Sequence, residues 1–206
     1  MTLKTVLSTV LLALVSAVGP SPGMAADTTS PDAQGYIRDW LMLAPIRLPE
    51  GGAAGDLLLA EQLKGEAALK PKSGDRVPVQ GRELTWKPIT AATNFVDFNA
   101  LLGSQNDRAA GFMVTYVECD DDIPNVIMAV GSNDQGRIYF NGVDIYAFTE
   151  ARPLVIDADK GKVTLKKGIN AIVFKIINEQ NSWQGSMRLL DQSGAPLKNI
   201  RIRTAP

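Results

Sequence analysis

Histidine is absent from all 206 residues of the chain. Histidine supplies the general base in Ser-His-Asp and Cys-His catalysis, and its imidazole is the commonest side-chain ligand of transition metals. Its absence excludes both of these catalytic arrangements. It also removes the usual ligand of a transition-metal centre.

Cysteine occurs only once, as Cys119. A single cysteine permits no intrachain disulfide. It follows the strand-like run 111–118, where a small apolar side chain is typically buried. A nucleophilic thiol needs a base that converts it to the thiolate, and no histidine is present to do so. We therefore expect Cys119 to be a buried, unreactive thiol.

Runs of basic residues are also lacking, because 21 Lys and Arg are spread among 22 Asp and Glu. Proteins that bind nucleic acid neutralise phosphates with clustered positive charge, so nucleic acid is excluded as an expected partner. Beyond residue 26, no apolar run is long enough to cross a bilayer. We therefore expect no transmembrane span in the mature chain.

The one long apolar run lies at the start of the chain. Lys4 supplies a positive charge, residues 5–18 are apolar apart from small hydroxyl residues, and 19–26 combine helix breakers with small residues. This pattern predicts a signal peptide over 1–26, whose apolar part is too short for a spanning helix. A flexible leader over 27–36 and a single domain over 37–206 complete the predicted organisation. The protein is therefore expected to be exported, and either periplasmic or secreted.

The stretch 131–146 predicts a β-hairpin. Asn141-Gly142 is a strong signal for a type I′ turn, because that turn needs positive φ at both central residues. The pairing that follows makes one face apolar and the other polar and aromatic, which is typical of an antiparallel sandwich. The predicted pairs are Phe140 with Val143, Tyr139 with Asp144, Ile138 with Ile145, and Arg137 with Tyr146.

Short strand-like runs separated by turn residues follow one another through most of the chain. Helical pattern is confined to 56–64, where Asp56 can cap the start and Gly65 can end the helix, with a further helical turn within 95–102. Pro45 interrupts the first strand and predicts an edge position or a bend. The predicted fold class is all-β: an antiparallel jelly-roll β-sandwich with one short helix in the N-terminal third. Its strands are predicted at 40–48, 84–87, 111–119, 126–130, 162–165, 169–177, 186–190 and 199–203.

Three segments resemble galactose-binding-like jelly-roll domains. Residues 131–142 are similar to their hairpin pattern G-S-x-D-x-x-x-x-x-x-N-G, and 165–175 to their following strand, L-x-x-G-x-N-x-x-x-x-K. The run 40–45 is similar to their opening W-x-x-x-G-P strand, with Ala44 where glycine is usual. The resemblance covers about residues 38–195. It implies the fold more strongly than the function, because this fold serves many unrelated tasks.

The resemblance implies a carbohydrate-binding or accessory role, since such domains often accompany glycan-active enzymes. The leading hypothesis is therefore an exported, non-catalytic carbohydrate-binding or accessory module. The alternative is a structural or protein-interaction domain of the cell envelope, and the third is a glycan-cleaving enzyme. We expect no enzymatic activity, because no catalytic constellation is recognisable. The expected partner is a glycan or a cell-envelope protein.

Aromatic rings beside polar groups are candidate sugar platforms, because the C–H faces of sugars stack on them. Trp183, in the polar loop 179–184, is the main candidate, against the alternative that it caps the end of the sandwich. The outer hairpin face is the second, against a ladder whose cross-strand pairs satisfy one another. The candidate carbohydrate-binding residues are Trp183, Tyr139, Tyr146, Arg137 and Asp144.

No cofactor is expected, although in some galactose-binding-like domains a structural calcium is present. Asp120, Asp121 and Asp122 offer three carboxylates in one turn, and Asp157 and Asp159 offer two at alternate positions. Neither set matches the twelve-residue calcium loop, and calcium needs about six to eight oxygen ligands. Solvated turn carboxylates are the alternative in both places.

Overall fold

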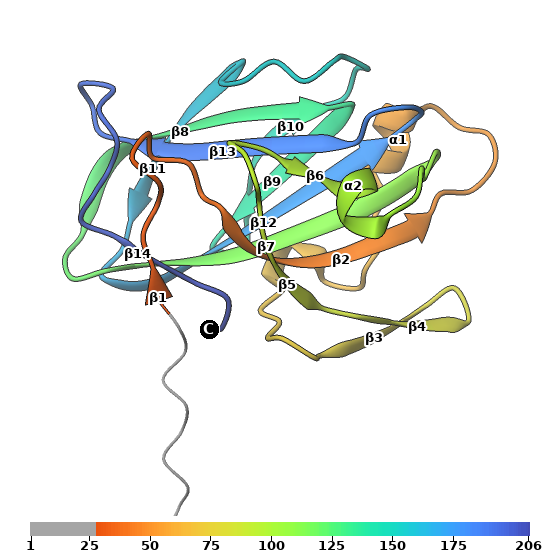
Figure 1. Ribbon diagram of the computed structural model, residues 1–206, viewed down its shortest axis with the longest axis horizontal. Coiled ribbons are helices and arrows are strands. Elements are labelled where there is room, and N and C mark those ends of the chain that lie inside the picture. The colour runs from red at the N-terminus through yellow and green to blue at the C-terminus, as the bar shows by residue number, and fades with distance from the viewer. Residues whose placement is uncertain (1–27) are drawn as a thin grey trace, which may run out of the picture.

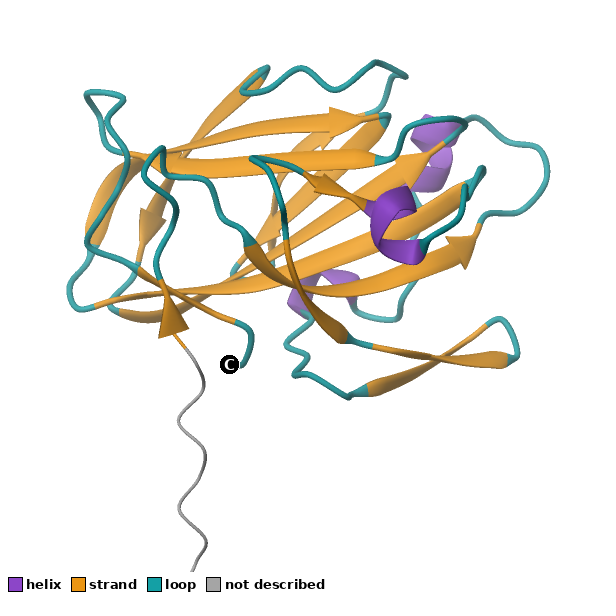
Figure 2. Cartoon of the chain, in the orientation of Figure 1, coloured by secondary structure: helices purple, strands orange, loops and turns teal. Residues whose placement is uncertain are grey.

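A computed structural model describes residues 28–206, so the predicted signal peptide over 1–26 lies outside the described residues. Strands dominate this part of the chain, and they form two layers packed face to face (Figures 1 and 2). Every strand pair is antiparallel. The predicted all-β antiparallel sandwich is therefore confirmed.

The larger sheet has the order β1-β14-β7-β12-β9-β10, with β2 paired to β7 and β5 paired to β2. The smaller sheet has the order β11-β8-β13-β6, and β3 and β4 form a separate pair. The strands are β1 Thr28–Thr29, β2 Asp39–Arg47, β3 Arg76–Val79, β4 Arg82–Thr85, β5 Lys87–Thr90, β6 Val96–Asp97, β7 Ala109–Cys119, β8 Ile123–Asn133, β9 Gln135–Phe140, β10 Val143–Phe148, β11 Asp159–Leu165, β12 Gly168–Asn178, β13 Gln184–Leu190 and β14 Arg201–Arg203.

Two apolar cores lie on the two faces of the larger sheet. The first fills the space between the sheets and includes Phe174 and Met187. The second lies on the outer face, where Leu58 and Trp86 from the segment before β6 cover Phe112. Strands β7 and β12 are buried on both faces, which explains why their sequences are almost continuously apolar.

Two short α-helices are present among the described residues, where the sequence predicted one helix and a further turn. Helix α1 spans Ala54–Leu59 and α2 spans Phe98–Leu102. The helix predicted over 56–64 is present with different bounds, because α1 starts two residues earlier and Ala60 is already extended. No side chain caps its start, and the Lys175 ammonium binds the carbonyl groups of Leu58 and Ala60 at its end. A single 3₁₀ turn, Glu66–Ala68, follows. No helix within residues 28–206 is long and apolar enough to cross a membrane.

The prediction of a flexible leader over 27–36 is wrong from residue 28 onward. Thr28 and Thr29 form β1, which pairs with β14. The Asp32 carboxylate accepts a hydrogen bond from the backbone N–H of Tyr36, whose ring is buried beneath the Arg188 guanidinium. An aromatic residue in the polar run supplies enough apolar area to fix this segment on the sandwich.

The strand containing Pro45 bends as predicted. Its pairing with β5 ends at Met42, and its register on β7 shifts between Leu43 and Ile46. Pro45 thus lies at a register shift where the strand has a partner on one side only, a position that tolerates the missing N–H of proline.

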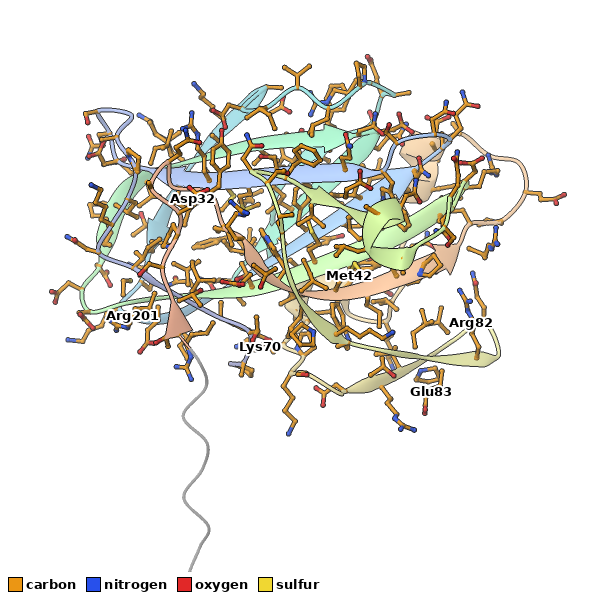
Figure 3. All side chains as sticks on the ribbon, in the orientation of Figure 1. Asp32, Met42, Lys70, Arg82, Glu83 and Arg201 are labelled. Atoms are coloured by element: carbon orange, nitrogen blue, oxygen red, sulfur yellow. The ribbon has the colours of Figure 1, made fainter. Side chains whose placement is uncertain are left out.

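The region 70–90 contains more strand than predicted. Strand β3 is not among the predicted strands, and the strand predicted at 84–87 is divided between β4 and β5. The β3–β4 hairpin lies beside the sandwich, and Figure 3 shows Glu83 on its outer side and Arg82 on the side facing β2. The Arg82 guanidinium donates a hydrogen bond to the carbonyl of Pro45. Val79 and Trp86 anchor this region to the outer face of the larger sheet.

The predicted hairpin at Asn141-Gly142 is present, with both turn residues at positive φ (50° and 84°). Phe140 pairs with Val143 and Tyr139 with Asp144, as predicted. A β-bulge then shifts the register, so that Tyr146 lies opposite Ile138 and Ala147 opposite Arg137. The two further predicted pairs are therefore wrong.

The bulge also changes which side chains of the hairpin face the core. Ile138 and Phe140 are buried, but Val143 and Ile145 are 61% and 38% exposed. The prediction that all four lie on one buried face is wrong, because β10 is the outermost strand of its sheet and leaves Val143 and Ile145 partly open to solvent. Tyr146 packs against the core in place of Ile145.

Candidate binding cleft

A cleft of about 120 Å³ opens between β10 and β11. These two strands are joined by the connection 149–158, which runs along the top of the view in Figure 1. The cleft lies at one side of the sandwich, where the core between the two sheets reaches solvent. Its floor is apolar and is formed by Met128, Val130, Ile138, Ile145 and Val163.

Both strands that border the cleft are outermost in their sheets. Strand β10 pairs only with β9, and β11 pairs only with β8, within residues 28–206. In an antiparallel edge strand, every second residue directs its N–H and C=O away from the neighbouring strand. The five consecutive residues Asp159–Val163 line the cleft, so the backbone of β11 itself forms part of its wall.

Gly161 leaves space on the inner side of β11. It pairs with Met128, whose side chain is in the core, so a side chain at position 161 would also face inward. A Cβ placed there meets no atom within 4 Å. The space between the sheets is therefore unfilled next to Gly161, whereas two residues along the strand Val163 fills it.

A polar cluster of Tyr146, Arg152 and Asp159 bridges the two sheets at one side of the cleft. The Tyr146 hydroxyl donates a 2.6 Å hydrogen bond to Oδ2 of Asp159, and the Arg152 guanidinium pairs with the same carboxylate. Arg152 also donates to the Tyr146 hydroxyl (3.0 Å) and lies 3.7 Å from the Phe148 ring centre. Burial raises the pKa of Asp159, but the hydrogen bonds from Arg152 and Tyr146 outweigh it and hold the pKa below its usual value of 3.8.

Replacing Asp159 with asparagine is expected to lower the free energy of unfolding by about 1–3 kcal/mol at neutral pH. The lowered pKa means that the folded state holds the Asp159 proton less tightly than the unfolded state does. This stabilisation is therefore complete above the ordinary pKa near 3.8 and is lost as pH falls through the lower folded-state value. Urea titrations should show the difference between Asp159→Asn and wild type shrinking below pH 4. A difference that is constant from pH 7 to pH 2 would contradict the charge-dependent role.

Two lysines stand on the rim of the cleft. Lys160 and Lys162 line it and are exposed, and neither makes an ion pair within residues 28–206. The negative charge of Asp159 is compensated by Arg152. The uncompensated charge along β11 is therefore positive.

The structure overturns the prediction that Trp183 is an exposed platform. Trp183 has 0% exposure, and its ring stacks on Phe98 with centroids 4.4 Å apart. Its indole N–H donates to the carbonyl of Ile176. A side chain at Gly111 would occupy the space of both rings, so the backbone there is matched to this pair. An indole packed on all sides offers no face to a sugar, and Trp183 instead fills the end of the sandwich.

The predicted polar hairpin face is divided between the outer core and the surface. Tyr139 is buried, which contradicts an exposed role, and its hydroxyl donates to Oε1 of Glu66 at 2.7 Å. Arg137 binds Asp144 through two nitrogens at 3.0 and 2.6 Å and lies over the Tyr139 ring, not the Tyr146 ring. Tyr146 alone among the five predicted residues lines the cleft.

Basic groups hold four of the five carboxylates predicted as calcium candidates. The Arg201 hydrogen bond lowers the pKa of Asp120, and the Lys167 backbone N–H together with the Lys166 ammonium lowers that of Asp122. The remaining ones are Asp121, which is exposed, Asp157, which pairs with Arg188, and Asp159, which pairs with Arg152. Within residues 28–206, no group of three or more acidic or cysteine side chains is placed to hold a metal ion.

Cys119 is buried, as predicted, and burial raises the pKa of its thiol. Its Sγ donates to the carbonyl of Lys166 at 3.1 Å. The thiol is therefore protonated at neutral pH and withdrawn from solvent, which fits an unreactive role.

One pair of carboxyl groups lies close together at the end of β9. Oδ2 of Asp134 accepts a hydrogen bond from the backbone N–H of Glu179 at 2.8 Å, and the Gln135 side chain binds the Glu179 carboxylate. Burial raises the pKa of Asp134. Neither carboxyl group lines the cleft, whose single carboxylate, Asp159, is already paired.

A buried ion pair that the sequence did not reveal lies on the outer face of the larger sheet. Nζ of Lys175 lies 3.0 Å from Oε1 of Glu66, and the two side chains are 0% and 3% exposed. Burial lowers the pKa of Lys175, and Glu66 opposes that shift. With its bonds to Leu58 and Ala60, the ammonium fastens α1 and the 3₁₀ turn to β12.

A larger hollow, of about 330 Å³, lies between β1, β5 and β14. Its one charged side chain is Asp39, which already accepts hydrogen bonds from the hydroxyls of Thr29 and Thr90. The hollow is larger than the cleft, but its one charged side chain is already occupied by these two hydrogen bonds. The cleft between β10 and β11 is therefore the better candidate site.

Comparison with protein families finds no match for the chain, and comparison with curated proteins finds none either. Among solved structures, the chain is similar to the β-glucuronidase of Ruminococcus gnavus, with 15% sequence identity and a TM-score of 0.39. The similarity covers 78% of this chain and 23% of that enzyme, so the chain spans about a quarter of its length. Membership in the galactose-binding-like family stays a prediction.

Proposed function

We propose that the chain is an exported, non-catalytic protein-interaction module that holds its partner in the cleft between β10 and β11. The single observation that carries this proposal is the meeting of two unpaired strand edges over an exposed part of the core. Unpaired edges attract further strands, because their N–H and C=O groups have no partner. Exposed Val143 and Ile145 add apolar area beside them.

A glycan is the second candidate for the cleft, and the specific observation in its favour is the polar cluster. Tyr146, Arg152 and Asp159 lie beside an apolar floor, which is the combination that sugar sites use. These groups already satisfy one another, however, and the three tryptophans of the described chain are buried. The geometry therefore favours a protein partner over a sugar.

Filling the cleft is expected to abolish binding without harming the fold. Gly161→Leu places a side chain in the unfilled space, and it should lower the affinity of cleft-binding peptides at least tenfold. Its melting temperature should not fall, because a Cβ at this position meets nothing and glycine is unfavourable in strands. Peptides would be selected from a random display library on the mature chain and measured by fluorescence anisotropy.

Affinity electrophoresis of the wild type and Gly161→Leu on soluble polysaccharides distinguishes a protein partner from a glycan. Retardation of the wild type that disappears in Gly161→Leu would favour the glycan and overturn the proposal. Selected peptides that bind both proteins equally would place their site elsewhere and also overturn it. Gly161→Ala serves as the matched control, since its single methyl group leaves most of the cleft open.

A further inference from the structure

An added strand at the free edge of β11 would have its side-chain directions fixed by those of β11. Side chains opposite each other in neighbouring strands lie on the same face of the sheet. The residue of an added strand opposite Gly161 would therefore point inward, into the cleft. Its two neighbours would lie opposite Lys160 and Lys162 and point outward.

The inward position selects for an apolar side chain. The floor of the cleft next to Gly161 is apolar and includes Met128, Ile138 and Val163. The two side chains with polar groups on its inner wall, Tyr146 and Asp159, already bind each other. A branched aliphatic side chain would bury its methyl groups there, whereas a hydroxyl or charge would lose its water without gaining a partner.

The two outward positions select for acidic side chains. Lys160 and Lys162 are exposed and have no acidic partner within residues 28–206, and they lie opposite the neutral Ala129 and Ile127 of β8. Opposite charges directly across a pair of strands attract, while like charges repel. An acidic residue on each side of the apolar one would give both lysines a partner.

From these three steps we infer that the cleft recognises an extended segment of a partner protein with the pattern acidic–aliphatic–acidic. This inference rests on the proposed function and specifies its partner. The segment adds to β11 through main-chain hydrogen bonds, inserts its aliphatic side chain beside Gly161, and pairs its two carboxylates with Lys160 and Lys162. Strand addition of this kind takes affinity from the main chain and specificity from alternate side chains.

The test uses fluorescein-labelled synthetic heptapeptides and the mature chain. The probe is Thr-Thr-Glu-Val-Glu-Thr-Thr, and its comparators carry Lys in place of both Glu, or Ser in place of Val. We expect the acidic probe to bind most tightly, and the double variant Lys160→Glu/Lys162→Glu to reverse the preference toward the basic peptide. Each reversed pair changes affinity by about two- to fivefold, so a change of about four- to twenty-fivefold is expected for both together.

The matched control is Lys87→Glu/Lys198→Glu, which changes the net charge equally at two exposed lysines outside the cleft. It should leave the order of the three peptides unchanged. The acidic pattern would be overturned if this control reversed the order of peptide affinities. It would also be overturned if Lys160→Glu/Lys162→Glu did not reverse that order. If charge has no effect but Gly161→Leu still abolishes peptide binding, the pattern falls while the proposed function stands.

Two other occupants are distinguished in the same experiment. Sedimentation velocity without peptide reports self-association, and a dimer lost in Gly161→Leu would show that a second copy occupies the cleft. Displacement of the probe by a neutral polysaccharide would show that a glycan does. Either result overturns the inference. A monomeric protein from which the polysaccharide does not displace the acidic peptide supports it.

Discussion

Replacing Glu66 with leucine is expected to lower the free energy of unfolding by about 3–5 kcal/mol, the effect typical of breaking a buried ion pair. The variant leaves the Lys175 ammonium buried with only the carbonyl groups of Leu58 and Ala60 as partners. It also removes the acceptor of the Tyr139 hydroxyl. A loss of this size is a large share of the total stability of a domain, and urea or guanidinium titration measures it.

The double variant Glu66→Leu/Lys175→Met is expected to recover most of that loss, because it removes the unpaired charge and keeps an apolar side chain in each place. The matched control is Glu83→Gln. It breaks the Arg76–Glu83 pair, whose side chains are 69% and 55% exposed, and should change stability by no more than about 0.5 kcal/mol. A loss below about 1 kcal/mol in Glu66→Leu, or strictly additive effects in the double variant, would show that the pair is not energetically coupled.

Trp183→Ala is expected to destabilise the fold by about 3–5 kcal/mol, since it removes a fully buried indole and leaves Phe98 without its stacking partner. For a domain of this size the melting temperature should fall by about 6–20 °C. The affinity of the folded protein for cleft-binding peptides should stay the same, because Trp183 does not line the cleft. Differential scanning calorimetry and peptide titration at low temperature measure the two effects separately.

Ser182→Ala is the control for this substitution, because it lies on the exposed part of the same loop and should change stability by no more than about 0.5 kcal/mol. Trp183→Phe should be intermediate, since it keeps a ring against Phe98. A Trp183→Ala protein that melts like the wild type but loses a ligand would restore the exposed-platform hypothesis.

The sequence predicted the sandwich well because its strongest signals are local. The turn at Asn141-Gly142 fixes its own backbone, and apolar runs such as 169–177 mark strands that are buried on both faces. The β-bulge after Asp144 could not be predicted in the same way. It depends on how β10 leaves the edge of its sheet, which is a property of the assembled layers.

The candidate site was predicted poorly for a related reason. Polar residues around Trp183 suggested exposure, but burial is decided by what packs against the ring, and Phe98 comes from a distant segment. The cleft depends on which strands are outermost and on an unfilled space beside Gly161, and neither follows from residue type. Lys175, inside an apolar run, was the one local sign of a buried partner, yet Glu66 lies 109 residues away in the sequence.

The pairing of β1 with β14 has a practical consequence. These strands form one border of the larger sheet and β10 forms the opposite border, so the first described residue and the C-terminal strand are neighbours at the side remote from the cleft. A tether attached after Pro206 would therefore leave the free edge of β11 and the cleft facing away from the attachment point. The protein can be immobilised on a sensor chip through that end, and ligand capture should proceed unobstructed.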